Sequence, residues 1–535
     1  MRLTKIKKED ILLFIFVILF LLTRITYLGK DEINPDAVNW HFRSEQFVVG
    51  LKTQDFKKTY QHYHPGVTLM WVVGPTVEVI KQMYPSEKVY NQFNFEVFHF
   101  ASKFVLVFIQ LVLTLIILYQ LSKIIGFTKA YFASSLFSLE PFFVGNSRLL
   151  HLDVLLTLFI FLGLLFAYRA FKKYSFWSSI MTGTFFALSF LTKSLGIGGL
   201  FFVSIWGAFK SVKKDKSALK VSLLILFGFV IISFLLFPAL WVEPIRVLTD
   251  IFKETARIGL RKGHGQILLG EYTRDAAFYF YLLVIALKVS PFTNFGIVLL
   301  VFYVLKSLHD YSKKGGTFKN IHFSEMGHLI KWTGVFYLGY FAVISLSSKK
   351  IDRYLIPEFP FLSLLAVDGY YRAKHHLPKF YTKIFLIIFA IFSIFYPLYK
   401  LFPYYFTYTS PLFGSSSNAN RFIAQKSFGI GIQNVRDVIL KKYRHYPRLG
   451  FIDSKPMRAI YMNSRTKDIR IDGTGDYDLL ILGINDEYNE DIQEMNIKFL
   501  NNSNEIIING VKFAKDTSIY INGLEYWRIY VKETI

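Results

Sequence analysis

Long apolar runs separated by polar stretches fill the chain up to residue 403. Their length, about 18 to 22 residues in most cases, matches the hydrocarbon thickness of a bilayer at the rise of an α-helix. The pattern therefore predicts a polytopic helical membrane protein with about eleven transmembrane helices. The predicted spans are residues 10–28, 97–120, 128–146, 149–169, 176–192, 194–210, 217–238, 276–305, 329–347, 354–371 and 380–402.

Two of these runs are interrupted. Lys193 separates the short fifth and sixth spans, and a single long helix that bends at this lysine is the alternative interpretation. The eighth span is overlong and contains Ser290-Pro291, which predicts a kink or a break, because proline removes a backbone donor and clashes with the preceding turn. If the chain had one span fewer at these positions, every later loop would lie on the opposite side of the membrane.

The longest loop, residues 29–96, follows the first span and carries two amphipathic segments, 38–50 and 67–83. Apolar faces of this kind fit helices that lie in the plane of the membrane interface. We expect this loop to cover a site at the membrane surface.

The pattern changes after residue 403. Apolar segments shorten to strand length at 479–482, 505–508, 518–521 and 527–531, and helical stretches lie between them. The fold predicted for the whole chain is therefore mostly α. A transmembrane domain, residues 1–403, is followed by a small soluble α/β domain, residues 404–535.

A formal net charge of +24 could indicate nucleic acid, but the basic residues cluster between pairs of spans, as the positive-inside rule requires of cytoplasmic loops. No nucleic acid partner is expected. The basic N-terminus is predicted to be cytoplasmic, and an odd number of crossings then places the C-terminal domain outside the plasma membrane. The first span lacks a small-residue cleavage site and is expected to remain as an anchor. The absence of cysteine excludes disulfides and thiolate metal sites.

Two carboxylates stand near the predicted outer ends of spans. Asp36 begins the first amphipathic segment and Asp153 begins the fourth apolar run. Each could accept a proton as a general base or shape a polar cavity, and each could instead cap a helix. For Asp153, an ion pair with Arg148 is a further alternative, and His151 is also near.

Several cations stand at the same predicted depth, where a lipid phosphate would lie, and Arg353 suits phosphate best because its guanidinium is a planar fork. For each cation alone, snorkelling towards the interface is the simpler explanation. These residues are Lys193, His264, Lys288 and Arg353.

His64 belongs to a His-Pro-Gly turn, and His62, His64 and Asp36 together form only a nonspecific metal pattern. No cofactor is therefore expected. No nucleotide-binding glycine motif occurs in the chain.

Taken in order, these motifs resemble membrane glycosyltransferases of the GT-C class, family 39, which includes protein O-mannosyltransferases and lipid A aminoarabinose transferases. The resemblance covers nearly all of the membrane part. It rests on Asp36 with Asn39-Trp40 and Arg43, His64-Pro65-Gly66, Ser147-Arg148 to Asp153, Leu191-Thr192-Lys193, Gly263-His264, Leu269-Gly270-Glu271, Phe278 to Tyr281, Ser290-Pro291, Arg353-Tyr354-Leu355-Ile356-Pro357 and the segment from Pro403 to Gly414.

The resemblance implies transfer of a sugar from a polyprenyl or dolichyl phosphate, with inversion, to a glycan, lipid or protein acceptor at the outer face. Asp36 would be the catalytic base and Asp153 a second acidic residue at the acceptor site. The substrate-binding residues implied are Arg43, His64, Arg148, Lys193, His264, Lys288, Arg353 and Tyr354. The family often has Asp-Glu in the first loop, so Asp31-Glu32 offers a competing register for the base.

Two other classes of function fit a polytopic protein. A secondary transporter or lipid flippase would show inverted repeats and polar residues near the bilayer midplane, whereas no repeat is found here and the polar residues gather at the outer boundary. A membrane-anchored glycan-binding protein would not need eleven crossings.

Overall fold

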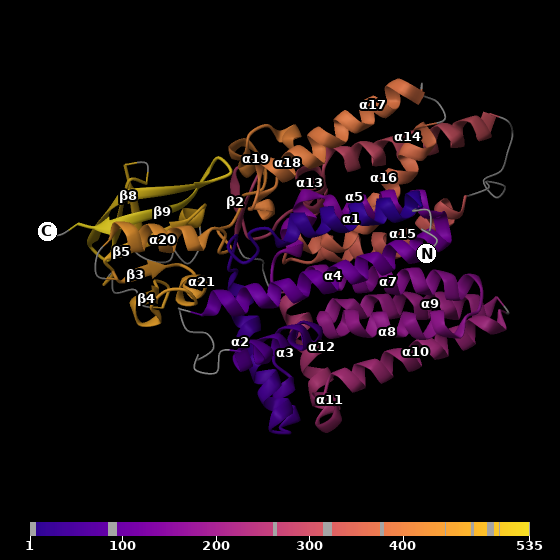
Figure 1. Cartoon of the computed structure of the whole chain (residues 1–535), viewed down its shortest axis with the longest axis horizontal. Coiled ribbons are helices and arrows are strands. Elements are labelled where there is room, and N and C mark those ends of the chain that lie inside the picture. Colours follow the sequence, from indigo (N-terminus) through magenta and orange to yellow (C-terminus); the bar gives the residue numbers. More distant parts are fainter. Residues whose placement is uncertain are drawn as a thin grey trace, which may run out of the picture.

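The structure is a computed structural model, and it describes residues 7–83, 94–213, 215–260, 265–313, 324–374, 379–443, 446–471, 476–488, 497–501 and 503–533. A bundle of helices forms one part of the molecule, and a β-sheet with short helices lies at one end of that bundle (Figure 1). The predicted fold class, mostly α with a C-terminal α/β part, is confirmed. The boundary at residue 403 stays a prediction.

Each predicted span is helical. The helices are α1 (Lys8–Ile25), α4 (Phe95–Ile125), α5 (Phe127–Leu139), α6 (Pro141–Ser147), α7 (Asp153–Lys172), α8 (Phe176–Thr192), α9 (Ile197–Val212), α10 (Lys216–Leu236), α13 (Phe280–Lys288), α14 (Pro291–Lys313), α15 (Glu325–Leu346), α16 (Phe359–Ala373), α17 (Lys379–Ala390) and α18 (Tyr396–Lys400). Within the described ranges, seven helices are long and apolar enough to cross a membrane, and α8 is apolar but shorter. The count of eleven crossings stays a prediction.

The interruptions in the apolar pattern are breaks between helices. α8 ends at Thr192 and α9 begins at Ile197, so two helices take the place of the single bent helix that the sequence allowed. α13 ends at Lys288 and α14 begins at Pro291, where the missing N–H of proline is harmless in a first turn. The predicted third span is also divided, into α5 and α6, at Pro141.

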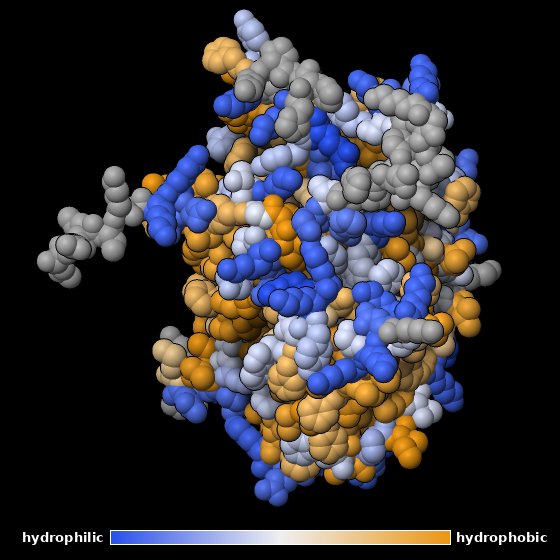
Figure 2. All heavy atoms as spheres, turned by 90° about the vertical axis from the view of Figure 1, so that its right-hand side faces the viewer, coloured by the Kyte–Doolittle hydropathy of each residue, from blue (hydrophilic) through white to orange (hydrophobic). Residues whose placement is uncertain are grey.

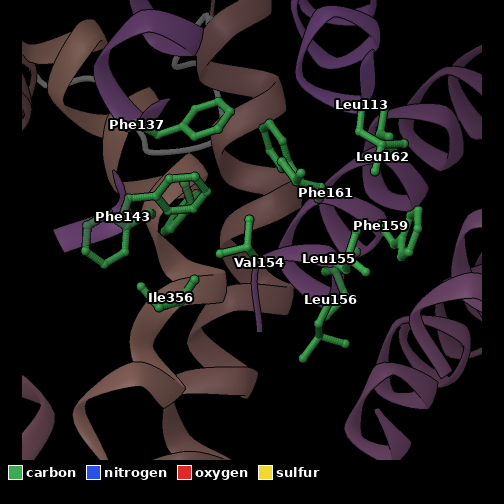
Figure 3. Packing of buried hydrophobic residues seen from close by; sticks show 14 of the residues in the cluster. Leu113, Phe137, Phe143, Val154, Leu155, Leu156, Phe159, Phe161, Leu162 and Ile356 are labelled. Atoms are coloured by element: carbon green, nitrogen blue, oxygen red, sulfur yellow. The ribbon is translucent and has the colours of Figure 1, made fainter. Parts of the chain in front are cut away.

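Helix α7 lies at the centre of the bundle. Eighteen of its 20 residues are buried, which fits a helix that is apolar all round. Figure 3 shows Val154, Leu156 and Phe161 of this helix among aromatic and aliphatic side chains from neighbouring segments. This packing fixes Asp153, the first residue of α7, at the sheet side of the bundle.

Shorter elements lie on the sheet side. The two predicted amphipathic segments are helices that pack against each other, α2 (Pro35–Lys52) and α3 (Val67–Met83). The other elements here are α11 (Ala239–Val242), α12 (Pro244–Leu260), the hairpin β1 (Gln266–Leu268) and β2 (Glu271–Thr273), the 3-10 helix η4 (Asp352–Glu358) and α19 (Ser416–Phe422).

The C-terminal sheet has seven described strands in the order β4-β3-β5-β9-β8-β7-β6. β3 pairs in parallel with β4 and β5, and the remaining pairs are antiparallel. The strands are β3 (Leu449–Phe451), β4 (Thr466–Asp468), β5 (Leu479–Gly483), β6 (Ile497–Leu500), β7 (Glu505–Ile508), β8 (Val511–Ile521) and β9 (Leu524–Lys532), and the helices are α20 (Ile432–Lys442) and α21 (Lys455–Arg458). Because β3, β4 and β5 are parallel, their carboxyl ends share one edge of the sheet.

The end of the bundle away from the sheet carries the basic clusters. α7, α9 and α14 run towards this end and finish near Lys172, Lys210 and Lys313. Figure 2 looks onto this end, where hydrophilic residues gather across the middle and apolar residues lie beside them. These three basic helix ends therefore lie on the side of the bundle away from the sheet.

Candidate active site

A cavity of about 930 Å³ lies between the membrane helices and the C-terminal sheet. This volume is at the upper end of the ~300–1,000 Å³ typical of ligand sites. One wall comes from α2 and the loop before α3, a second from the sheet-side ends of the membrane helices, and a third from the segment Ile423–Gly429 and the C-terminal domain. Residues after β3 and β5, among them Asp453 and Asp486, line the third wall, at the carboxyl edge where α/β sheets commonly bind ligands.

Asp36 is the second residue of α2 and faces this cavity. The side chain of Asn34, and not that of Asp36, caps the helix by accepting a hydrogen bond from the Ala37 N–H at 2.7 Å. The Asp36 carboxylate is thus available for other contacts. Its side chain is 39% exposed, whereas those of the neighbouring His151 and Arg353 are 11% and 12% exposed.

A chain of charged groups runs from Asp36 into the bundle. His151 Nε2 lies 3.2 Å from Asp36 Oδ2, and the other ring nitrogen, Nδ1, lies 3.0 Å from Asp153 Oδ2 without the alignment of a hydrogen bond. Asp153 Oδ1 in turn accepts a hydrogen bond from Lys193 Nζ at 2.8 Å.

Arg353, in η4, completes this group. Its Nη2 donates to Asp36 Oδ2 at 3.3 Å, and its guanidinium carbon lies 4.4 Å from the centroid of the Phe428 ring. Its Nη1 is buried and has no hydrogen-bond partner among the described residues. A guanidinium nitrogen left without a partner, on a residue that lines a cavity, has an unused N–H group that a small shift of the side chain could offer to an anionic ligand.

Aromatic rings and one glycine fix the other side chains. The Arg43 guanidinium lies 4.7 Å above the Trp40 ring, and Lys193 Nζ lies 4.5 Å from the ring centroid of Tyr354. Gly66 adopts φ 61°, and a Cβ there would come within 2.2 Å of the Trp40 ring. The glycine of the His-Pro-Gly motif is therefore required by the close approach of the tryptophan.

His64 lines the cavity, and its Nδ1 lies 3.2 Å from Ser194 Oγ. Since Ser194 directly follows Lys193, this contact ties the loop before α3 to the break between α8 and α9. The predicted residues Asp36, Arg43, His64, Lys193, Arg353 and Tyr354 all line the cavity.

The electrostatics at Asp36 favour the carboxylate. Burial alone would raise the pKa of Asp36, but the contact with His151 and the positive charge of Arg353 outweigh burial and hold this pKa well below its usual range. Asp36 is therefore ionised at neutral pH. In this arrangement it binds a proton only weakly.

The other predicted residues are placed differently. Lys288 lines the cavity, but its buried amine donates to the Tyr408 carbonyl at 2.9 Å. Asp153 lies just behind the cavity wall and reaches it through His151. His264 lies outside the described residues.

Arg148 does not line the cavity, and it forms no ion pair with Asp153. It is buried, and its Nε donates to Asp31 Oδ2 at 2.7 Å, while Lys103 binds both Asp31 at 3.1 Å and Glu32 at 2.7 Å. The side chains of these four residues are at most 5% exposed. Asp31 and Glu32, the competing register for the base, are thus occupied by buried cations.

Two residues that the structure places at the site, His151 and Phe428, were not predicted from the sequence to belong to it. His151 was only a candidate partner for Asp153, although a histidine two positions before a helix-starting carboxylate is a signal for a shared cluster. Phe428 gave no signal, because its contact with Arg353 joins segments that are far apart in the chain. Among the described residues, no three or more His, Asp or Glu side chains converge on one point so that they could hold a metal ion, and independence of metal stays a prediction.

The comparisons with known proteins agree with the sequence analysis. A family model described as dolichyl-phosphate-mannose-protein mannosyltransferase matches residues 91–241, a stretch that includes His151, Asp153 and Lys193. A search of curated proteins finds none that matches the chain.

Among solved structures, ArnT from Cupriavidus metallidurans bound to undecaprenyl phosphate is 12% identical with a TM-score of 0.50, over 97% of both chains. The oligosaccharyltransferase AglB from Archaeoglobus fulgidus, in complex with an inhibitory peptide and a dolichol-phosphate, is 11% identical with a TM-score of 0.46, over 90% of this chain and 70% of that one. The S. cerevisiae protein O-mannosyltransferase Pmt1-Pmt2 complex bound to the sugar donor is 16% identical with a TM-score of 0.35, over 50% and 39%. The ArnT likeness shows a shared fold. Together with the family match, it confirms the resemblance drawn from the sequence.

Proposed function

We propose that this chain, a membrane glycosyltransferase of the GT-C class, moves a sugar from a polyprenyl or dolichyl phosphate to an acceptor at the outer face of the membrane. Asp36 is the general base, and the sugar is transferred with inversion. The observation that carries this proposal is the position of Asp36 in the cavity wall, in contact with both Arg353 and His151. The undecaprenyl phosphate bound by ArnT is a carrier lipid of the kind that the proposed reaction releases.

The chemistry follows from these contacts. The acceptor oxygen or nitrogen bonds to the anomeric carbon while the bond from that carbon to the phosphate oxygen breaks. The lipid phosphate leaves with the bonding electron pair, and the proton of the acceptor goes to the Asp36 carboxylate. Buried cations stabilise the charge that develops on the departing phosphate.

Arg353 has a part in both halves of this step. The free Nη1 can bind a phosphate oxygen, and a phosphate that also takes up Nη2 would loosen the contact with Asp36. Since Arg353 is one cause of the low pKa of Asp36, donor binding would then make Asp36 a stronger base. The base would gain strength only when a donor is present.

His151, Asp153 and Lys193 support Asp36 from behind. The Lys193 ammonium partly neutralises Asp153, and Asp153 orients the ring of His151 towards Asp36. We assign His151 and Asp153 to orientation of the base and to the shape of the acceptor side of the cavity. Arg43, above the Trp40 ring, and the half-exposed side of Asp36 leave room there for a polar acceptor.

The decisive experiment is the release of polyprenyl phosphate from a radiolabelled lipid-linked sugar by the purified, full-length protein. Asp36→Asn removes the base and keeps the shape, so we expect release to fall by about 10²- to 10⁴-fold, the range for loss of a general base. Asp55→Asn is the matched control, since the Asp55 side chain lies in the same loop, is 43% exposed, and pairs only with Lys58 among the described residues. Full release by Asp36→Asn would refute the assignment. Transport of unmodified lipid without release would favour a flippase.

The proposed orientation places the N-terminus in the cytoplasm and the C-terminal domain outside the plasma membrane. It is supported by the basic clusters at the helix ends away from the sheet. Because the chain contains no cysteine, single substitutions can report it: Ser417→Cys should react with a membrane-impermeant maleimide in intact cells, and Lys173→Cys only after lysis. The reverse pattern would contradict this orientation.

A further inference from the structure

The segment that enters the C-terminal domain crosses the cavity wall in an unusual backbone conformation. Phe428, Gly429 and Gly431 have φ angles of 43°, 71° and 65°. Glycine adopts such angles freely, but phenylalanine does so rarely, so surrounding contacts must hold Phe428 in place. These contacts come from the other end of the chain.

The backbone of Asp31–Ile33 pairs with that of Gly429–Gly431, and we call this pairing the clasp. The Ile33 N–H donates to the Gly429 carbonyl at 3.1 Å, the Gly431 N–H donates to the Asp31 carbonyl at 2.9 Å, and Glu32 and Ile430 form an antiparallel bridge between them. A Cβ at Gly429 would lie 1.9 Å from the Ile33 carbonyl oxygen. Only glycine fits this approach.

Buried side chains hold both halves of the clasp. The Asp31 and Glu32 carboxylates are bound by Arg148 and Lys103, and the Trp527 indole N–H donates to the Ile430 carbonyl at 2.7 Å. The first half is thus attached to the membrane helices and the second to strand β9. The clasp is therefore fixed to both parts of the molecule.

The clasp positions Asp36 and Phe428, which both contact Arg353. Asp36 follows Ile33 by three residues, and Phe428 directly precedes Gly429. The guanidinium of Arg353 lies between them, with Nη2 towards Asp36 at 3.3 Å and its carbon 4.4 Å from the Phe428 ring centroid. Phe406 stacks on Phe428 with ring centroids 5.5 Å apart and an interplanar angle of 20°.

We infer that Phe428 is a positioning residue for Arg353: the clasp presents its ring as a platform that holds the guanidinium in the cavity wall beside Asp36, within reach of the phosphate of the donor. A ring face attracts the guanidinium without using any N–H group, so the edge of the fork stays available for hydrogen bonds. The C-terminal domain thereby takes part in donor binding. This inference rests on the proposed function.

The test compares Phe428→Leu, which stays apolar and loses the ring face, with Phe428→Tyr, which keeps the face. Phe422→Leu is the matched control, because its ring contacts Phe413 and does not line the cavity. We measure binding of undecaprenyl phosphate to the full-length protein, together with kcat and KM for sugar release. For Phe428→Leu we expect binding to weaken about three- to tenfold, with KM rising more than kcat falls. Phe428→Tyr and Phe422→Leu should bind like the parent protein.

A double-mutant cycle with Arg353→Lys separates positioning from a general structural role. If Phe428 acts through Arg353, Phe428→Leu should weaken binding at least threefold less in the Arg353→Lys background than in the parent. Equal effects in both backgrounds, or parental binding by Phe428→Leu, would overturn the inference. A parent protein that neither binds undecaprenyl phosphate nor releases sugar would instead refute the proposed function.

Discussion

Arg148 is fully buried and Arg353 lies in the cavity wall with 12% of its side chain exposed, and the structure predicts opposite consequences when each is replaced by methionine. Arg148 contacts Asp31 and three backbone carbonyls at the end of α1, those of Thr23, Arg24 and Thr26. Methionine fills much of the same volume but satisfies none of these acceptors. Asp31 would keep only Lys103 as a cationic partner.

The magnitude follows from these contacts. Breaking a buried ion pair by removing one partner costs about 3–5 kcal/mol, and buried carbonyls left unpaired add to this. Against a total stability on the order of 5–15 kcal/mol, Arg148→Met should lower the midpoint of thermal unfolding in detergent by several degrees. The KM for the donor should not change in the protein that remains folded, because Arg148 lies outside the cavity.

Arg353→Met should behave in the opposite way. Asp36 is 39% exposed and keeps its contact with His151, so stability should change by less than about 1–2 kcal/mol. Sugar release should fall by about 10²- to 10³-fold, as when one donor to a developing negative charge is removed. The assay pairs unfolding curves with donor kinetics for both variants. A stable Arg148→Met with a raised KM would refute the structural role and restore the substrate-binding role that the sequence predicted.

Three further changes probe the cavity wall. Gly66→Ala should reduce both stability and sugar release, because the new Cβ would displace the Trp40 ring; unchanged unfolding and kinetics would contradict this close approach. Burial and the charge of Arg43 lower the pKa of His62 to about 4, so the unfolded chain takes up a proton that the folded chain refuses as pH falls from 6.5 to 4. Stability should decline over that range by about 1–3 kcal/mol, and His62→Phe should flatten the profile in unfolding curves at several pH values. Burial raises the pKa of Asp486 to about 6, so ionisation destabilises the folded state as pH rises from 3.8 to 6. Asp486→Asn should therefore raise stability at pH 7 by about 1–3 kcal/mol, and a loss of stability at that pH would contradict the assignment.

Most helices and two of their breaks could be predicted because they depend on local signals, whereas the break at Pro141 was not predicted. Apolar length gives the spans, Pro291 marks the start of α14, and the polar residue Lys193 marks the break between α8 and α9. Asp36, which lines the cavity, was singled out for a similar reason, as a carboxylate at the start of an amphipathic segment. The sequence offered Asp36 as the cap of this helix, whereas Asn34, two positions earlier, caps it.

What could not be predicted depends on contacts between distant segments. Arg148 had the charge and the position of a phosphate ligand, and only packing shows that Asp31 holds it. Phe428 becomes part of the site because residues 31–33 pair with residues 429–431. No periodicity or spacing in the sequence carries that information.

The buried charges around Asp31 have a consequence for how the chain is made. Lys103 lies within α4 and Arg148 follows α6, whereas their carboxylate partners follow α1. An unpaired cation in the bilayer raises the free energy of an inserted helix. Helix α4 is therefore stable in the bilayer only when Lys103 can pair with Asp31 and Glu32. We therefore expect the first and second helices to associate before the ribosome finishes the third, and intermediates that stop short of Arg148 to remain with the insertion machinery.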